Sequence, residues 1–214
     1  MDQKKAKLAE LKSKMQNNKD LPLRHGATNL VFGEGNPDSE IYFIGEAPGY
    51  FEDQQGRPFV GQAGKLLDKL IESIGLERKD VYISNIVRFR PPGNRDPEPE
   101  EIAAFQPYVD KEIEIIDPKI IVTLGRFSMN KFWPDVKISK VHGQVRKINW
   151  NGKEVLLIPM FHPAAALRAD AVMQQLKQDF QIIKKTLEQK PDPEKDAGQA
   201  SMTEEKKPEQ LNLL

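Results

Sequence analysis

Residues 41–49 have the sequence IYFIGEAPG, in which an apolar run stops at a small polar cluster. Three more apolar runs, each short enough to be one strand, end in a similar way. Such runs are typical of parallel strands that are buried on both faces, and ligands bind outside the carboxyl ends of these strands. The three runs occupy residues 81–84, 120–124 and 155–160 and end at Asn85, at Gly125 and near His162. We therefore expect Glu46, Asn85 and His162 to meet in one crevice.

Four segments with helical periodicity lie between or after these runs. Apolar residues recur in them at the three- and four-residue spacing of a helix that covers one face of a sheet. The segments occupy residues 64–74, about 96–113, 126–132 and about 170–188. Parallel strands require crossovers of this kind. The sequence predicts a three-layer α/β/α sandwich with a central four-stranded parallel sheet.

The chain divides into three parts by composition. Residues 1–29 are predicted to form an N-terminal helix and a linker, and residues 30–189 contain all the predicted strands and form the expected globular domain. In residues 190–214 apolar residues almost vanish, so this tail cannot offset its ordering entropy and is predicted to be disordered. The apolar stripe of the first helix consists of Leu8, Leu11 and Met15.

Charge and cysteine content exclude several classes of site. The 32 basic residues balance the 32 acidic ones, so net charge neither indicates nor opposes nucleic-acid binding. The chain has no cysteine, which excludes disulfides, thiolate metal sites and cysteine nucleophiles. No apolar run approaches the roughly 20 residues that span a bilayer, and no signal-peptide core follows the basic N-terminus. We expect a cytoplasmic protein without membrane contact.

Each residue at a strand end also has a structural explanation when it is taken alone. Glu46 can be solvated or cap a helix, Asn85 can satisfy local backbone groups, and His162 before a proline can be a turn residue. Their joint placement at the ends of separate strands favours a common site instead. A nucleotide-binding α/β protein is an alternative, but neither a Gly-x-Gly-x-x-Gly nor a Walker loop follows the first strand.

Five separated motifs occur in a fixed order along the chain. They are residues 45–49 (GEAPG) with 52–53 (ED), 56–61 (GRPFVG), 84–85 (SN), 90–97 (RPPGNRDP) and 162–168 (HPAAALR). Together they resemble the motifs of family 4 of the uracil-DNA glycosylases, over roughly residues 30–187. The resemblance implies a parallel-sheet α/β/α sandwich and a DNA-repair hydrolase that releases uracil from DNA and leaves an abasic site for base excision repair.

The resemblance also implies a role for each residue at a strand end. Breaking the C1′–N1 bond produces a cationic sugar and a uracil anion, and in a duplex the nucleotide must first flip out of the stack. Glu46 would orient or polarise the attacking water, and His162 would donate a hydrogen bond to uracil O2. Phe59 would stack on the base, and the Asn85 amide would read the N3 and O4 edge, which differs in cytosine. The base pocket would also include Gly45 and Ala47.

The implied DNA contacts come from one apolar wedge and several basic residues. Leu167 with Arg168 would insert into the stack, although Leu167 can instead begin the packing of the last helix. His142 would face the DNA backbone, and a structural role is the alternative for it. The candidates for phosphate contact are Arg88, Arg90, Arg95, Lys140 and Arg168.

The chain departs from the family at its metal centre. The resemblance implies an iron–sulfur cluster on four cysteines, but Asn18, Leu21, Phe89 and Phe105 stand at the matching positions. None of these side chains can bind iron, so we expect no cofactor. We predict that the three apolar residues fill the space as a small hydrophobic cluster.

The last five residues, QLNLL at 210–214, are an apolar exception in the polar tail. They resemble the peptide with which bacterial repair and replication proteins dock on the sliding clamp. An extended peptide with spaced apolar anchors fits a preformed groove, and the tail would act as a tether. A stray apolar end is the alternative. The anchors would be Gln210, Leu211, Leu213 and Leu214.

Together these features predict a monomeric, metal-free uracil-DNA glycosylase. No lysine occupies a clear pocket position, so we expect hydrolysis without a lyase step. The short segment 139–144 lacks the basic, histidine-containing insertion of the covalent uracil-trapping branch, which favours turnover. The main alternative is a non-catalytic protein that binds uracil or damaged DNA and is tethered to the clamp. The intact Glu46, Asn85 and His162 oppose that alternative.

Overall fold

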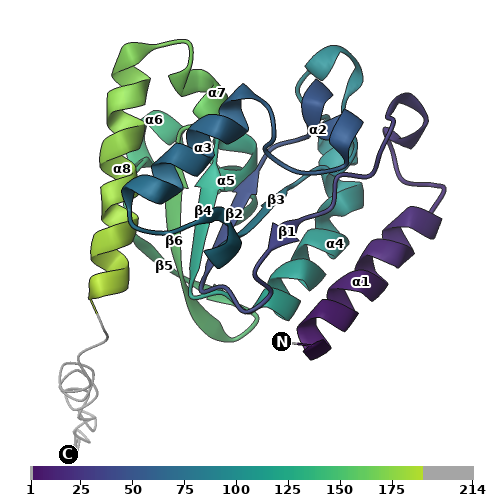
Figure 1. Cartoon of the computed structure of the whole chain (residues 1–214), viewed down its shortest axis with the longest axis horizontal. Helices are drawn as coiled ribbons and strands as arrows, with labels where there is room; N and C mark the ends of the chain where they lie inside the picture. Colours follow the sequence, from purple (N-terminus) through teal and green to yellow (C-terminus); the bar gives the residue numbers. More distant parts are fainter. Residues whose placement is uncertain (1, 190–214) are drawn as a thin grey trace, which may run out of the picture.

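The four apolar runs form the parallel centre of a sheet in the computed structural model, which describes residues 2–189 (Figure 1). Within these residues the sheet has six strands in the order β1-β3-β2-β4-β6-β5. The strands are β1 (Glu34–Gly35), β2 (Ile41–Gly45), β3 (Tyr82–Asn85), β4 (Ile120–Leu124), β5 (Arg146–Trp150) and β6 (Lys153–Met160). Phe43 of β2 pairs in parallel register with Ile83 on one side and with Val122 on the other. The predicted four-stranded parallel centre is confirmed, and the whole sheet has two strands more than predicted.

The two additional strands, β1 and β5, pair antiparallel at the edges of the sheet. β1 has only two residues, which is too short to show a period. β5 is exposed or half-buried along its length, so it contains no apolar run. Edge strands of this kind leave little signal in a sequence, because only strands buried on both faces must be continuously apolar.

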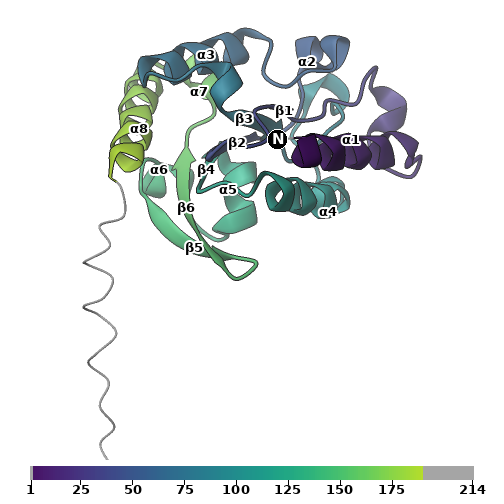
Figure 2. The same ribbon diagram turned by 60° about the horizontal axis from the view of Figure 1, so that its bottom comes forward.

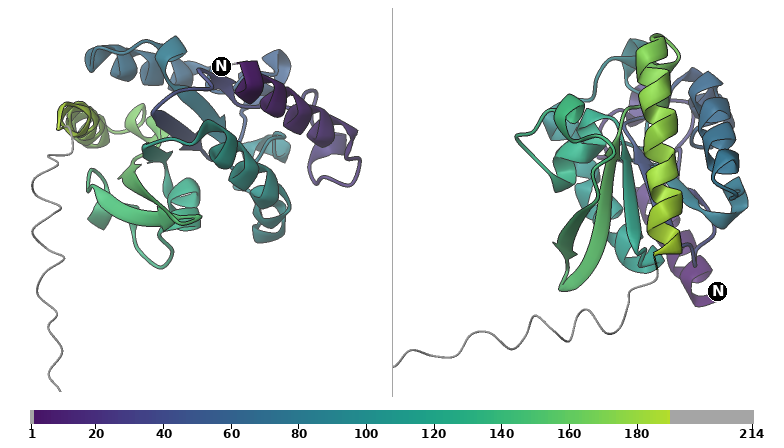
Figure 3. Two further views of the ribbon diagram at one scale, coloured as in Figure 1. Left: turned by 90° about the horizontal axis from the view of Figure 1, so that it is seen from below. Right: turned by 90° about the vertical axis from the view of Figure 1, so that its left-hand side faces the viewer.

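Helices cover both faces of the sheet (Figures 2 and 3). Tyr42 and Ile44 belong to the core beneath α1 and α4, whereas Ile41 and Phe43 belong to the core beneath α3 and α8, as the two-residue period of a strand requires. The helices are α1 (Asp2–Asn17), α2 (Tyr50–Gln55), α3 (Gln62–Ser73), α4 (Pro99–Ile116), α5 (Arg126–Phe132), α6 (Ile138–Val141), α7 (Pro163–Ala166) and α8 (Asp170–Glu188). None of these helices combines the length and the apolarity needed to cross a membrane.

Helix α1 lies against α4 and closes one side of the core. Its apolar stripe is buried, as the spacing of Leu8, Leu11 and Met15 predicted. The Lys4 ammonium group at the start of α1 donates to the backbone carbonyl of Ile116 at 2.8 Å. The N-terminal helix is therefore part of the same hydrophobic core as strands β2 and β3.

Candidate active site

A cavity of about 580 Å³ opens at the carboxyl ends of the central strands. Glu46 follows β2, Asn85 ends β3 and His162 follows β6, and all three line this cavity together with Phe59. Figure 1 shows α2 and α7 at the same end of the sheet. The structure thus brings together the polar residues from three of the four strand ends.

Asn85 has a buried amide oxygen at the wall of the cavity. This Oδ1 atom has no hydrogen-bond partner among the described residues. It therefore does not satisfy a local backbone group, which was the structural alternative for Asn85. A buried acceptor without a partner costs about 1–3 kcal/mol, so the atom is suited to an N–H group of a ligand. Gly45 makes room for it, because a Cβ at this position would lie 2.5 Å from Asn85 Oδ1 and 2.5 Å from the Phe59 ring.

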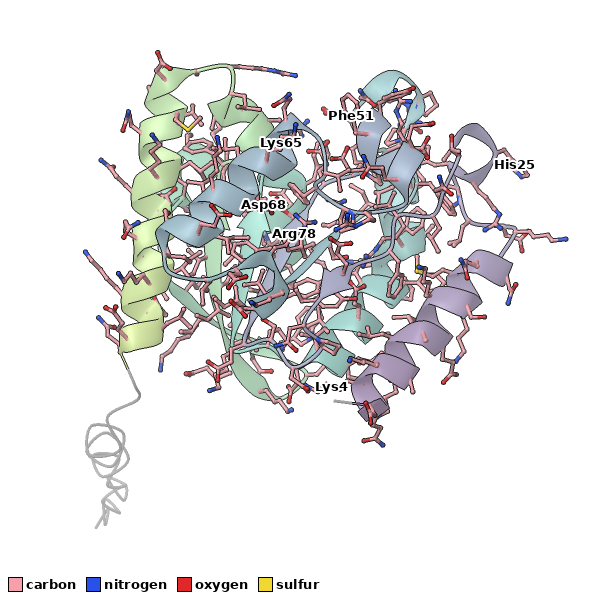
Figure 4. All side chains as sticks on the ribbon, viewed as in Figure 1. Lys4, His25, Phe51, Lys65, Asp68 and Arg78 are labelled. Carbon is pink, nitrogen blue, oxygen red and sulfur yellow. The ribbon has the colours of Figure 1, made fainter. Side chains whose placement is uncertain are left out.

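Phe59 occupies the cavity wall in a backbone conformation that its residue type disfavours. Its φ angle of 50° lies in the left-handed region, where a side chain other than glycine costs of order 1–3 kcal/mol. Arg78 donates to the Phe59 carbonyl at 3.1 Å and is itself paired with Asp68 at 2.8 Å; Figure 4 labels both residues. Glu52 accepts the N–H groups of the two residues after Phe59 at 2.9 and 2.8 Å. These bonds offset the strain and fix the ring.

His162 is a neutral imidazole with its proton on Nε2. It is the N-cap of α7, and its Nδ1 accepts the N–H group of Ala164 at 3.1 Å, which assigns the proton to Nε2. Burial lowers the pKa of His162 to about 4, and the charge of Arg168 acts in the same direction, while Glu52 opposes it. His162 is therefore a turn residue and also a neutral hydrogen-bond donor at the cavity wall.

The pKa of the Glu46 carboxyl group is raised to about 7, mainly because the group is partly buried. The negative charge of Asp96 raises it further, and Arg126 opposes this effect. Glu46 does not cap the next helix, since the N-cap of α2 is Gly49. A carboxyl group that exchanges its proton near neutral pH is suited to general-base catalysis.

Basic side chains surround the opening of the cavity. Arg95, Arg126 and Arg168 belong to its lining. Arg95 is already engaged, because it donates to both oxygens of the Glu101 carboxylate at 2.8 and 2.6 Å. Arg90 donates to the side chain of Asn94, another lining residue, at 2.7 Å. Arg126 is paired with Asp96, so Arg168 is the lining cation best suited to a phosphate of a polyanion such as DNA.

Besides Arg88 and Arg90, three of the predicted DNA contacts lie outside the cavity lining. Leu167 is 48% exposed, so it does not belong to the core beneath α8. Lys140 is exposed on α6. His142 has structural partners, since its Nδ1 lies 2.8 Å from Asp179 Oδ2 and its ring packs against Phe161.

Arg88 is not a phosphate contact, contrary to the prediction from the sequence. Its side chain is 1% exposed and pairs with the equally buried carboxylate of Glu112 at 2.6 Å. Tyr42 donates to the same carboxylate at 2.5 Å. An arginine so enclosed cannot reach DNA, and its charge instead balances a buried acid in the core beneath α4. The sequence gives no sign of this ion pair, because Arg88 and Glu112 are distant along the chain.

The sequence did not assign three residues that now have evident positions in the site. Glu52 fixes the Phe59 loop, and Asp96 and Arg126 form an ion pair in the cavity wall. Arg126 lies two residues after the end of β4, so its place near a strand end was an available signal.

The residues at the expected cluster positions do not fit an iron–sulfur cluster. Leu21, Phe89 and Phe105 are buried in one apolar core, and the two aromatic rings lie 6.1 Å apart. The predicted hydrophobic cluster is thus confirmed. The fourth residue, Asn18, donates its amide to the Tyr108 hydroxyl at 2.9 Å. Among residues 2–189, no group of three or more His, Asp or Glu side chains has an arrangement that holds a metal ion.

Comparisons with known proteins agree with this architecture. The family model of the uracil DNA glycosylase superfamily matches residues 32–187. A type-4 uracil-DNA glycosylase of Sulfurisphaera tokodaii is 47% identical over 183 residues, which cover 83% of each chain. That of Saccharolobus solfataricus is 49% identical over 76% of this chain and 78% of the relative, and that of Thermotoga maritima is 49% identical over 69% and 76%. The chain therefore belongs to the uracil-DNA glycosylase superfamily, and most of its length is similar in sequence to type-4 members.

Proposed function

We propose that this protein is a monofunctional uracil-DNA glycosylase that flips uracil out of DNA and hydrolyses the bond between uracil N1 and sugar C1′. The products are free uracil and the abasic site that base excision repair acts on. The observation that carries the proposal is the convergence of Glu46, Phe59, Asn85 and His162 in one cavity. The activity named for the relatives supports the same reaction.

Uracil would be selected by stacking and by its hydrogen-bonding edge. Phe59 supplies an apolar aromatic face for the base. The unpaired Asn85 oxygen accepts the N3–H group of uracil, and the amide nitrogen donates to O4. Cytosine presents an acceptor at N3 and a donor at N4, so it would leave the same amide mismatched and buried. Ala47 lines the cavity beside the proposed base, and Gly45 leaves room there for Asn85 and Phe59.

In the proposed hydrolysis, Glu46 would act at the sugar and His162 at the uracil base. When the C1′–N1 bond breaks, its electron pair stays on the uracil ring and negative charge appears on O2. The His162 imidazole is neutral and donates its Nε2–H to that oxygen as the negative charge develops. The Glu46 carboxylate orients a water for attack on C1′ and accepts its proton, for which a pKa of about 7 is suited.

DNA would be held by a wedge and by phosphate contacts around the opening. Leu167 fills the gap that the flipped nucleotide leaves, and Arg168 beside it holds the strand. Arg90, Arg95, Lys140 and His142 complete the proposed contacts. The mechanism has no Schiff-base step, because no lysine among residues 2–189 lines the cavity.

The sliding-clamp peptide at Gln210–Leu214 lies outside the described residues, and we propose it from its sequence alone. Docking on the clamp would raise the enzyme's effective concentration on DNA. We further propose that the protein is a bacterial enzyme that acts as a monomer in the cytoplasm.

The proposal is tested by incubating the protein with a labelled oligonucleotide that contains one uracil and then cleaving abasic sites with alkali. Wild type and E72Q, which changes an exposed carboxylate on α3, should give the cleaved product, and E46Q should give almost none. If the wild type bound the oligonucleotide in a gel-shift assay but gave no product, the non-catalytic binding protein would be the correct interpretation.

A further inference from the structure

Two aromatic side chains lie exposed beside the mouth of the cavity. Tyr50 and Phe51 begin α2 and are 51% and 55% exposed. Their chain neighbours, Gly49 and Glu52, belong to the cavity lining. Figure 4 shows Phe51 at the end of the molecule where α2 and α7 lie. The proposed mechanism uses neither ring, although large apolar side chains at such a position usually mark a binding surface.

Tyr50 and Phe51 contact each other but have different further neighbours. They meet edge to face, with centroids 5.5 Å apart and 79° between the planes. The guanidinium group of Arg90 lies 5.2 Å from the centre of the Tyr50 ring. Phe51 stands beside Gly61, where a Cβ would lie 3.4 Å from its Cδ2 atom. Tyr50 thus contacts both a cation and its neighbour, and Phe51 has the slightly larger exposed fraction.

The charges around this pair indicate which partner it fits. Arg90 contacts Tyr50, and Arg168 belongs to the lining of the same opening. Cations next to exposed aromatic rings are the combination with which proteins hold single-stranded nucleic acid, because the phosphates need the charge and the bases need an apolar face.

We propose that Phe51 stacks on an unpaired base next to the extruded uracil when the DNA is single-stranded. Tyr50 supports the ring from its edge, and Arg90 neutralises the phosphate beside that base. In a duplex the neighbouring base stays paired and stacked, so Phe51 has nothing to bind and Leu167 acts as the wedge instead. The inference rests on the proposed function and adds a specificity residue for one form of the substrate.

The test compares F51L, which keeps an apolar side chain but removes the aromatic face, with F51W, which keeps that face. On a single-stranded oligonucleotide with one uracil, F51L should raise KM about tenfold, F51W should stay near wild type, and kcat should not change. On the duplex F51L should match wild type, whereas L167A should lose activity mainly there. V145A is the control for the loss of exposed apolar surface in general, because Val145 is exposed and lies outside the cavity lining.

A second substrate, with alkali-stable tetrahydrofuran analogues of abasic nucleotides on both sides of the uracil, removes the proposed stacking partner. Wild type should then lose about as much affinity as F51L does on the normal strand, and F51L should lose nothing further. Independent, additive losses would overturn the proposal, and so would equal effects of F51L on single- and double-stranded DNA.

The fluorescence of 2-aminopurine beside the uracil separates this inference from the proposed function. If wild type released no uracil at all, the proposed function would fail. Titration would still decide the stacking, because quenching by wild type and not by F51L supports it, while equal quenching by both proteins overturns it.

Discussion

The Phe59 ring stacks on the His162 imidazole, with 5.6 Å between the centroids and 28° between the planes. Phe59 comes from the loop between α2 and α3, and His162 from the turn after β6. In the proposed mechanism the contact joins the surface on which uracil stacks to the donor that takes up its negative charge. A change that moves either ring is therefore expected to disturb both stacking and catalysis.

Replacing Gly45 by alanine is expected to abolish uracil excision. The new Cβ would lie 2.5 Å from both Asn85 Oδ1 and the Phe59 ring, so these two groups must move apart. Overpacking of this kind costs about 1–3 kcal/mol of stability, and urea unfolding should show the loss. The matched control is G26A, because a Cβ at Gly26 meets nothing within 4 Å. Wild-type excision by G45A would contradict the close packing of Gly45 against Asn85 and Phe59.

Replacing Glu52 by alanine is expected to lower kcat/KM about ten- to a hundredfold. The Glu52 carboxylate accepts the N–H groups of Val60 and Gly61, and hydrogen bonds to a charged group contribute about 1.5–3 kcal/mol. Without them the strained Phe59 loop should relax. Q55A, on the exposed side of the same short helix, should leave kcat/KM unchanged. An E52A protein as active as Q55A would show that Phe59 is fixed by other groups.

Excision should rise with pH as Glu46 loses its proton. The pKa of Glu46 is raised to about 7, so kcat/KM should be low in acid and level off above neutrality. The negative charge of Asp96 is one cause of this raised pKa, so D96N should lower it and move the acidic limb to lower pH. The measurement is kcat/KM against pH for both proteins. If the acidic limb of the D96N profile stayed in place or moved to higher pH, the titration of Glu46 would not be the cause of that limb.

Deletion of residues 210–214 should abolish capture by a bacterial sliding clamp and leave excision from short oligonucleotides intact. The peptide is remote in sequence from every residue that lines the cavity, so only tethering should change. A pull-down with purified clamp measures the first effect and the alkali-cleavage assay the second. If the shortened chain were pulled down as well as the full chain, the clamp proposal would be wrong.

The centre of the fold was predictable because burial on both faces forces continuous apolar runs. β4 and the helices α5 and α8 have the bounds that the sequence predicted. The edge strands and the short helices α2, α6 and α7 were not predicted, since a half-exposed strand or a single helical turn shows no period.

The site was predictable where a residue lies at the carboxyl end of a buried strand, as Glu46, Asn85 and His162 do. It was not predictable where pairing depends on distant segments. The sequence alone could not show that Arg88 is enclosed by Glu112, or that Asp96 and Arg126 pair in the cavity wall. Such pairs are set by the packing of helices on the sheet, which has no local signature.

Base selection by Asn85 decides whether the cavity is a uracil site. Matched oligonucleotides carrying one uracil or one cytosine are incubated with wild type and with N85D, and abasic sites are cleaved with alkali. Wild type should release uracil and leave cytosine in place, because the Asn85 amide both accepts and donates. N85D should lose most uracil excision and gain release of cytosine, whose N4 amino group can donate to the new carboxylate. Undiminished uracil excision by N85D, with cytosine untouched, would contradict the claim that Asn85 reads the base.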